Sequence, residues 1–109
     1  MMKRILILLI ALTFTNQAFS ADEKVFSIII KDHKFVPDIL QVPAGEKFKL
    51  IVKNEDNTAE EFESYDLRKE KIVAGNKEIT LIINPLQKGE YKFEGEFHPK
   101  TAQGKLVAK

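Results

Sequence analysis

The sequence predicts an all-β fold, a sandwich of two packed sheets with about seven to eight strands. Apolar residues recur at every second position in four short runs, and most positions between them are polar or charged. Glycine, proline, asparagine and aspartate separate the runs at short intervals, and no stretch carries a convincing helical period. Because alternation with a charged outer face is typical of antiparallel sheets that bury one side, antiparallel pairing is expected.

The strands are expected, in chain order, at residues 25–31, 47–54, 78–84 and 90–98, with a short last strand at 106–107. Each long run places three apolar side chains on its inner face: Phe26, Ile28 and Ile30 in the first, Phe48, Leu50 and Val52 in the second, Ile79, Leu81 and Ile83 in the third, and Tyr91, Phe93 and Phe97 in the fourth. Residues 65–71 are dense in charge and leave room for a single helical turn.

Residues 1–20 are predicted to be a secretory signal peptide, and residues 21–109 the only domain. A basic start precedes an apolar run over residues 5–14, and Ala18 and Ser20 stand at the −3 and −1 positions of a cut after about Ser20. The alternative, a retained anchor, needs roughly 20 apolar residues, about twice this run. We therefore expect a periplasmic protein without stable membrane insertion after cleavage. The chain has no cysteine, which excludes a lipid anchor and disulfides.

Charge and motifs narrow the function classes further. The net charge is +1 and becomes slightly negative once Lys3 and Arg4 leave with the signal, so neither nucleic acid nor an anionic membrane is an expected partner. The sequence holds no phosphate-binding glycine loop, nucleophile elbow, zinc-protease motif or cysteine nucleophile. We therefore expect no enzyme, and the oligomeric state stays open.

Three segments carry a family resemblance. They are Phe35-Val36-Pro37 with Ile39, Val42 and Gly45; Asn54-Glu55-Asp56 followed by Glu60-Glu61-Phe62; and Gly89-Glu90-Tyr91-Lys92-Phe93 followed by His98 and Gly104-Lys105-Leu106-Val107. In this order and spacing they resemble the cupredoxins, the fold of the small blue copper proteins. The resemblance covers almost all of the mature chain and implies a Greek-key β-sandwich.

The sequence departs from that family at the metal ligands. A blue copper centre needs a thiolate, two imidazoles and a weak axial thioether. Gly95 stands at the cysteine position, Ala102 at the methionine position and Glu60 at the first histidine position, so His98 alone remains. Without a thiol we expect no type 1 copper and no electron transfer of the blue copper kind.

Residues 60–67 and 96–104 are similar, more narrowly, to the periplasmic cupredoxin-like proteins of the EfeO type, which are associated with bacterial iron-permease uptake systems. This resemblance implies a metal-binding accessory protein that handles an iron or copper ion. It also implies a membrane iron-permease-type transporter as the partner.

The expected metal ligands are imidazole nitrogens and carboxylate oxygens. His98 keeps the ligand position of the closing loop, and the family resemblance puts His33 and the loop of Glu60 at the same end of the sandwich. Glu60 ranks first among the glutamates because alternation faces it toward the core, followed by Glu61 and Glu63. Such a set suits a borderline ion such as copper, zinc or iron, and carboxylate shifts the preference toward the harder ions.

Plainer interpretations stay open for each of these residues. Either histidine can be an ordinary surface residue, and the glutamates at 60–63 can be solvated charge that blunts a strand edge. Glu96 points outward by alternation and is expected to be at most an indirect neighbour of the metal. The alternative function is therefore a metal-free structural or protein-interaction module on the same scaffold.

Overall fold

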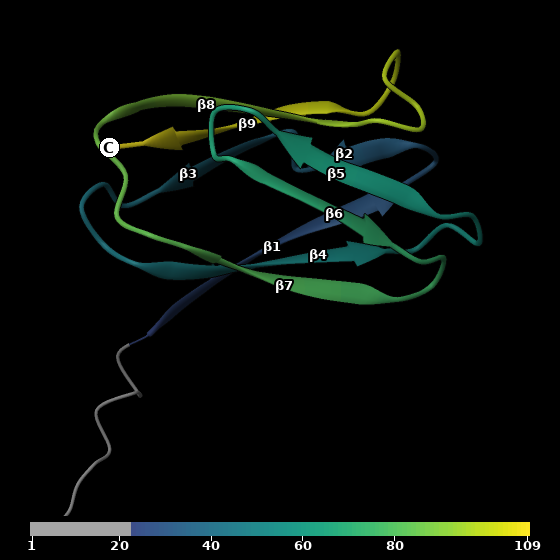
Figure 1. Cartoon of the computed structure of the whole chain (residues 1–109), viewed down its shortest axis with the longest axis horizontal. Coiled ribbons are helices and arrows are strands. Elements are labelled where there is room, and N and C mark those ends of the chain that lie inside the picture. Colours follow the sequence, from purple (N-terminus) through teal and green to yellow (C-terminus); the bar gives the residue numbers. More distant parts are fainter. Residues whose placement is uncertain (1–22) are drawn as a thin grey trace, which may run out of the picture.

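The alternating runs form strands that stack as two sheets in the computed structural model, which describes residues 23–109 (Figure 1). The strands are β1 (Lys24–Lys31), β2 (Lys34–Val36), β3 (Ile39–Val42), β4 (Phe48–Asn54), β5 (Glu60–Ser64), β6 (Lys69–Val73), β7 (Glu78–Ile83), β8 (Gly89–Gly95) and β9 (Gln103–Ala108). The predicted signal peptide lies outside the described residues. Within residues 23–109 no helix is long and apolar enough to cross a membrane.

The two sheets have different sizes and mixed pairing. One contains four strands in the order β2-β1-β4-β7, and the other contains five in the order β3-β9-β8-β5-β6. β1 runs parallel to β4, and β3 runs parallel to β9, while the other pairs are antiparallel. The expectation of antiparallel sheets is therefore wrong in part, because alternation along one strand does not depend on the direction of its neighbour.

The all-β sandwich is confirmed, with nine strands where about seven to eight were expected. Residues 65–68 form a turn, and the chain then enters β6 instead of a helical turn. Two β-branched residues, Ile72 and Val73, favour this strand, and pairing with β5 completes it. Phe97 was expected on the inner face, but its side chain is exposed because β8 ends at Gly95 and the alternation stops there.

The core lies between the sheets, and an aromatic cluster fixes the strands that flank the candidate site. The ring centroid of Phe93 in β8 lies 4.9 Å from that of Phe35 in β2 and 5.1 Å from that of Phe62 in β5. All three side chains are buried. Such aromatic pairs contribute roughly 0.5–1.5 kcal/mol beyond the area they bury. The cluster therefore packs β2 of one sheet against β5 and β8 of the other, the strands from which the site is built.

Gly104 allows β9 to pass close to the ring of Phe93. A Cβ at this position would lie 2.5 Å from Cε1 of Phe93 and 2.8 Å from the carbonyl oxygen of Asp38. Gly104→Ala is therefore expected to lower the free energy of unfolding by about 1–3 kcal/mol through overpacking. Urea unfolding measures this change, and an unaltered midpoint would show that the Phe93 ring moves aside without loss.

Candidate functional site

One end of the sandwich gathers the β1–β2 turn, the β4–β5 loop and the β8–β9 loop. His33 of the first and His98 of the last stack face to face, with ring centroids 3.6 Å apart and planes 10° from parallel. A metal ion lies close to the plane of each imidazole that binds it. Two stacked rings therefore direct their nitrogen lone pairs along separate, nearly parallel planes, and at least one ring would have to turn for both to bind one ion.

The β1–β2 turn that carries His33 is held by a chain of hydrogen bonds from β4. Asp32 and His33 have φ angles of 54° and 59°, in the left-handed region. The Asp56 carboxylate accepts the backbone N–H groups of Asp32 at 2.8 Å and His33 at 3.0 Å. Asn54, itself buried, accepts the N–H of Asp56 at 3.0 Å and donates to the carbonyl of Thr58 at 2.8 Å. His33 is thus positioned by residues of another strand and loop.

Asp56 makes this arrangement dependent on pH. Burial raises the pKa of Asp56, but the N–H groups of His33 and Asp32 and the nearby positive charges outweigh it, so the pKa lies below its ordinary value. Since the unfolded pKa is higher, at about 3.9, the carboxylate adds stability that is complete above that value. This contribution is lost as the pH falls through the lower pKa of the folded protein.

Asp56→Asn is therefore expected to destabilise the protein at neutral pH. On acidification from about pH 5 to about pH 2 it is expected to lose less additional stability than the wild type, because asparagine has no proton to take up. Urea unfolding at both pH values measures the difference. Parallel pH profiles for the two proteins would contradict this role of Asp56.

Glu60 fills the space beside Gly95, and its side chain is almost fully buried. Its Oε1 accepts the backbone N–H groups of Glu61 at 2.9 Å and Phe97 at 2.8 Å. Its Oε2 lies 2.7 Å from Nδ1 of His98. Both oxygens of Glu60 are thus engaged within the protein, and the carboxylate ties β5 to the β8–β9 loop.

The same carboxylate occupies the volume that a side chain at position 95 would need. A Cβ on Gly95 would lie 2.6 Å from Cδ and 2.7 Å from Oε2 of Glu60, and 2.6 Å from Cβ of Ala102. The chain has no cysteine, so a blue copper site is absent. Within the described residues, His33, His98 and Glu60 do not form a group of three ligand atoms close enough together for one ion.

The outer face of the five-stranded sheet carries a cluster of glutamates, here called the carboxylate face. It consists of Glu61 and Glu63 of β5, Glu70 of β6, Glu94 of β8, and Glu96 immediately after β8. The register sets Glu63 opposite Glu70 on one neighbouring strand and opposite Glu94 on the other. No ion pair with lysine or arginine joins these glutamates in the part of the chain that the structure describes. Like charges directly opposite one another destabilise a sheet.

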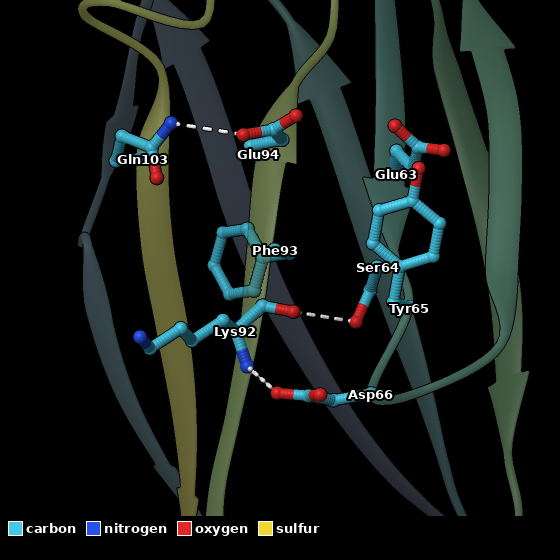
Figure 2. Close-up of a pocket in the computed structure, with 8 residues that line it drawn as sticks. All are labelled: Glu63, Ser64, Tyr65, Asp66, Lys92, Phe93, Glu94 and Gln103. Atoms are coloured by element: carbon cyan, nitrogen blue, oxygen red, sulfur yellow. Dashed lines mark hydrogen bonds between the residues drawn. The ribbon is translucent and has the colours of Figure 1, made fainter.

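Glu63 lies at the centre of this face and is only 9% exposed. Its buried Oε1 has no hydrogen-bond partner among residues 23–109. Figure 2 shows its carboxylate beside a shallow pocket of about 220 Å³, where Gln103 donates to Glu94 at 3.0 Å but no hydrogen bond reaches Glu63. A buried acceptor without a donor costs roughly 1–3 kcal/mol. A cation would give this oxygen the partner that the protein does not.

The carboxylate face offers two groups of three ligand atoms. One oxygen each from Glu63, Glu94 and Glu96 lie within 4.8 Å of one another, and so do one oxygen each from Glu61, Glu70 and Glu96. Oxygens that bind one hard cation at 2.3–2.6 Å are separated by roughly 5 Å or less. Both groups therefore have a spacing suited to a metal ion, and Glu96 belongs to both.

In the group formed by Glu61, Glu70 and Glu96, the pKa of Glu61 is also shifted. The carboxyl of Glu70, which shares a hydrogen bond with Glu61, raises the pKa of Glu61. Burial acts in the same direction, as do the negative charges of Glu70, Glu96 and Glu60. The Glu61–Glu70 pair thus gathers more negative charge than its surroundings balance, and a proton or a metal ion can relieve the excess.

The structure separates the predicted ligands into two sets. His33, Glu60 and His98 meet at the end of the sandwich, while Glu61 and Glu63 lie on the carboxylate face. Sequence reasoning missed Glu70 and Glu94, and it gave Glu96 only an indirect place. The available signal is a pair of Glu-x-Glu stretches, residues 61–63 and 94–96, whose strands pair with each other in the sheet.

The fold and the altered copper position define a cupredoxin-type sandwich without a blue copper centre. The family model for the cupredoxin-like domain matches residues 4–108, and the chain belongs to that family. An uncharacterised protein of Rickettsia prowazekii is 52% identical over 80 residues, which are 73% of this chain and 64% of the relative. The chain thus spans less than two thirds of that relative's length.

Solved structures share the fold at low sequence identity. Auracyanin A, a blue copper protein from Chloroflexus aurantiacus, is 16% identical with a TM-score of 0.69, covering 81% of this chain and all (100%) of that one. Amicyanin from Paracoccus versutus is 16% identical with a TM-score of 0.60, covering 82% and 83% of the two chains. A purple cupredoxin from Nitrosopumilus maritimus is 18% identical with a TM-score of 0.58, covering 76% and 98%.

Proposed function

We propose that this protein is an exported metal-binding accessory protein that holds a hard metal cation on its carboxylate face. The observation that carries the proposal is the buried, unpaired Oε1 of Glu63, which lies among carboxylates that no lysine or arginine of residues 23–109 neutralises. An unbalanced cluster of this kind is a poor structural element but a good cation receptor, because the cation supplies the missing charge and the missing partner.

The ligand chemistry selects the class of metal. All five side chains of the face offer carboxylate oxygens, which suit hard ions. The histidines that would favour copper stack on each other at the end of the sandwich and belong to neither carboxylate group. Of the two metals that the sequence suggested, iron is therefore the better candidate and copper the poorer one. Several coordination positions would be left to water, which allows the ion to be passed on.

The proposal includes a role in metal uptake, which the exposed carboxylates at the edge of the site, Glu70 and Glu96, support. The predicted signal peptide would bring the protein to the periplasm, where an ion held by surface carboxylates can be handed to a membrane transporter of the iron-permease type. The cupredoxin-like scaffold contributes a rigid sheet that holds the carboxylates, and no thiolate chemistry is needed.

Titration calorimetry with Mn²⁺, a hard dication that is stable in air, tests the proposal, and Fe²⁺ under anaerobic conditions extends it. Wild-type protein is expected to bind Mn²⁺, and Glu63→Gln is expected to weaken the binding at least about tenfold, equal to roughly 1.4 kcal/mol. Glu90→Gln is the matched control, because Glu90 lies on β8 outside the cluster and pairs with Lys105 at 3.0 Å. It is expected to leave binding unchanged.

His98→Ala distinguishes Mn²⁺ binding at the carboxylate face from Mn²⁺ binding at the end of the sandwich that carries His33 and His98. If the face binds the ion, this variant retains Mn²⁺ binding. Binding lost in His98→Ala and retained in Glu63→Gln would refute the site. No binding of Mn²⁺ or Fe²⁺ by the wild type would refute the function and leave a metal-free interaction module.

A further inference from the structure

We infer that the carboxylate face holds a pair of cations bridged by Glu96, rather than one. The inference rests on the proposed function and specifies the occupancy of that site. Its basis is the geometry of the two groups of oxygens, Glu63–Glu94–Glu96 and Glu61–Glu70–Glu96, which share a single residue. A carboxylate has two oxygens, so one side chain can bind one ion with each.

The strand order explains why the groups are adjacent but separate. In the five-stranded sheet β5 lies between β8 and β6, so Glu94 and Glu70 approach β5 from opposite sides. Glu94 and Glu70 both stand opposite Glu63, and β5 lies between them. An ion held by Glu94 therefore lies toward β8, and an ion held by Glu70 lies toward β6.

Glu96 reaches both positions because it follows the last residue of β8. Its backbone N–H donates to the carbonyl of Glu61 at 2.8 Å, which draws the end of β8 against β5. This contact places the Glu96 side chain between the two glutamates of β5 that head the two groups. Bridged ions of this kind lie roughly 3.5–4 Å apart.

Charge balance also favours a pair of cations. A single dication bound by Glu63, Glu94 and Glu96 would give the buried Oε1 of Glu63 a partner but leave Glu61 facing Glu70. Lys69 of β6 and Lys92 of β8 lie near this face, but no lysine or arginine of residues 23–109 forms an ion pair with its glutamates. A second dication would neutralise the Glu61–Glu70 pair.

The test counts Mn²⁺ ions in the purified protein by native mass spectrometry and detects their coupling by electron paramagnetic resonance. The wild type is expected to bind two ions at saturation and to give the broadened, spin-coupled spectrum of a close pair. Glu94→Gln and Glu70→Gln are each expected to reduce the count from two to one and to restore the spectrum of an isolated ion. The control Glu90→Gln keeps two coupled ions.

The outcomes separate this inference from the function on which it rests. One ion per chain at saturation, or two ions without coupling, overturns the bridged pair and leaves the metal-binding function standing. A Glu70→Gln variant that binds as many coupled ions as the wild type also overturns the pair. If the wild type binds no ion, both the pair and the proposed function fail.

Discussion

Replacing Glu60 by alanine is expected to destabilise the protein by about 3–5 kcal/mol. The side chain is 1% exposed, and its two oxygens accept from two backbone N–H groups and contact Nδ1 of His98. Alanine would leave these groups inside the protein without their partner and would empty the volume beside Gly95. For a domain of this size such a loss lowers the melting temperature by roughly 12–40 °C.

Glu60→Gln is the informative companion to this variant. It preserves the volume and one acceptor oxygen for the two N–H groups, so we expect it to lose much less stability, about 1–2 kcal/mol. Thermal and urea unfolding compare the two variants, with Glu90→Gln as the surface control. A Glu60→Ala protein within about 1 kcal/mol of the wild type would mean that water takes over the contacts of Glu60, and its anchoring role would be rejected.

Replacing Glu63 by glutamine is expected to have effects of opposite sign on stability and on metal binding. In metal-free protein the change is expected to stabilise the fold by about 1–2 kcal/mol, because it removes a buried charge whose Oε1 is unpaired. It also relieves the repulsion from Glu70 and Glu94, the residues directly opposite in the register. The amide can donate to either of them.

Added Mn²⁺ is expected to reduce this advantage. An ion at 100 times its dissociation constant stabilises the wild type by roughly 2.7 kcal/mol, whereas a variant that binds ten times more weakly gains roughly 1.4 kcal/mol. Thermal unfolding with and without Mn²⁺ therefore gives a smaller lead of the variant in melting temperature when the ion is present, and weaker binding than this reverses the order. If Glu63→Gln melts lower than the wild type under both conditions, the carboxylate stabilises the fold by itself, and the explanation of its unpaired oxygen is wrong.

The fold was predictable where a strand has one buried and one exposed side. The expected run at 47–54 corresponds to β4 (Phe48–Asn54), and the run at 78–84 corresponds to β7 (Glu78–Ile83). Two features were not predictable from such patterns. Parallel pairing of β1 with β4 leaves no mark on the period of either strand. β6 lies at a sheet edge, where exposed charged residues hide the alternation.

The candidate site was predictable residue by residue but not as an assembly. Alternation placed Glu60 inside and Glu61 and Glu63 outside, as in the structure. Only the register between strands shows that Glu70 and Glu94 stand opposite Glu63. Glu70 was missed because β6 was not recognised as a strand, and Glu94 because a single sequence does not specify register across the long connection between β5 and β8. Burial of Glu63 on an outer face is likewise a product of its neighbours.

A cysteine cannot be introduced at position 95 by a single substitution. A thiol introduced at Gly95 would collide with the carboxylate of Glu60, and shortening Glu60 alone would leave its donors stranded. A blue centre in this scaffold would therefore need Gly95 and Glu60 replaced together, and Ala102, whose Cβ would lie 2.6 Å from a Cβ at position 95, would have to move or change as well. Either substitution made alone is therefore expected to give a protein that folds less well than the present one, so the two residues depend on each other.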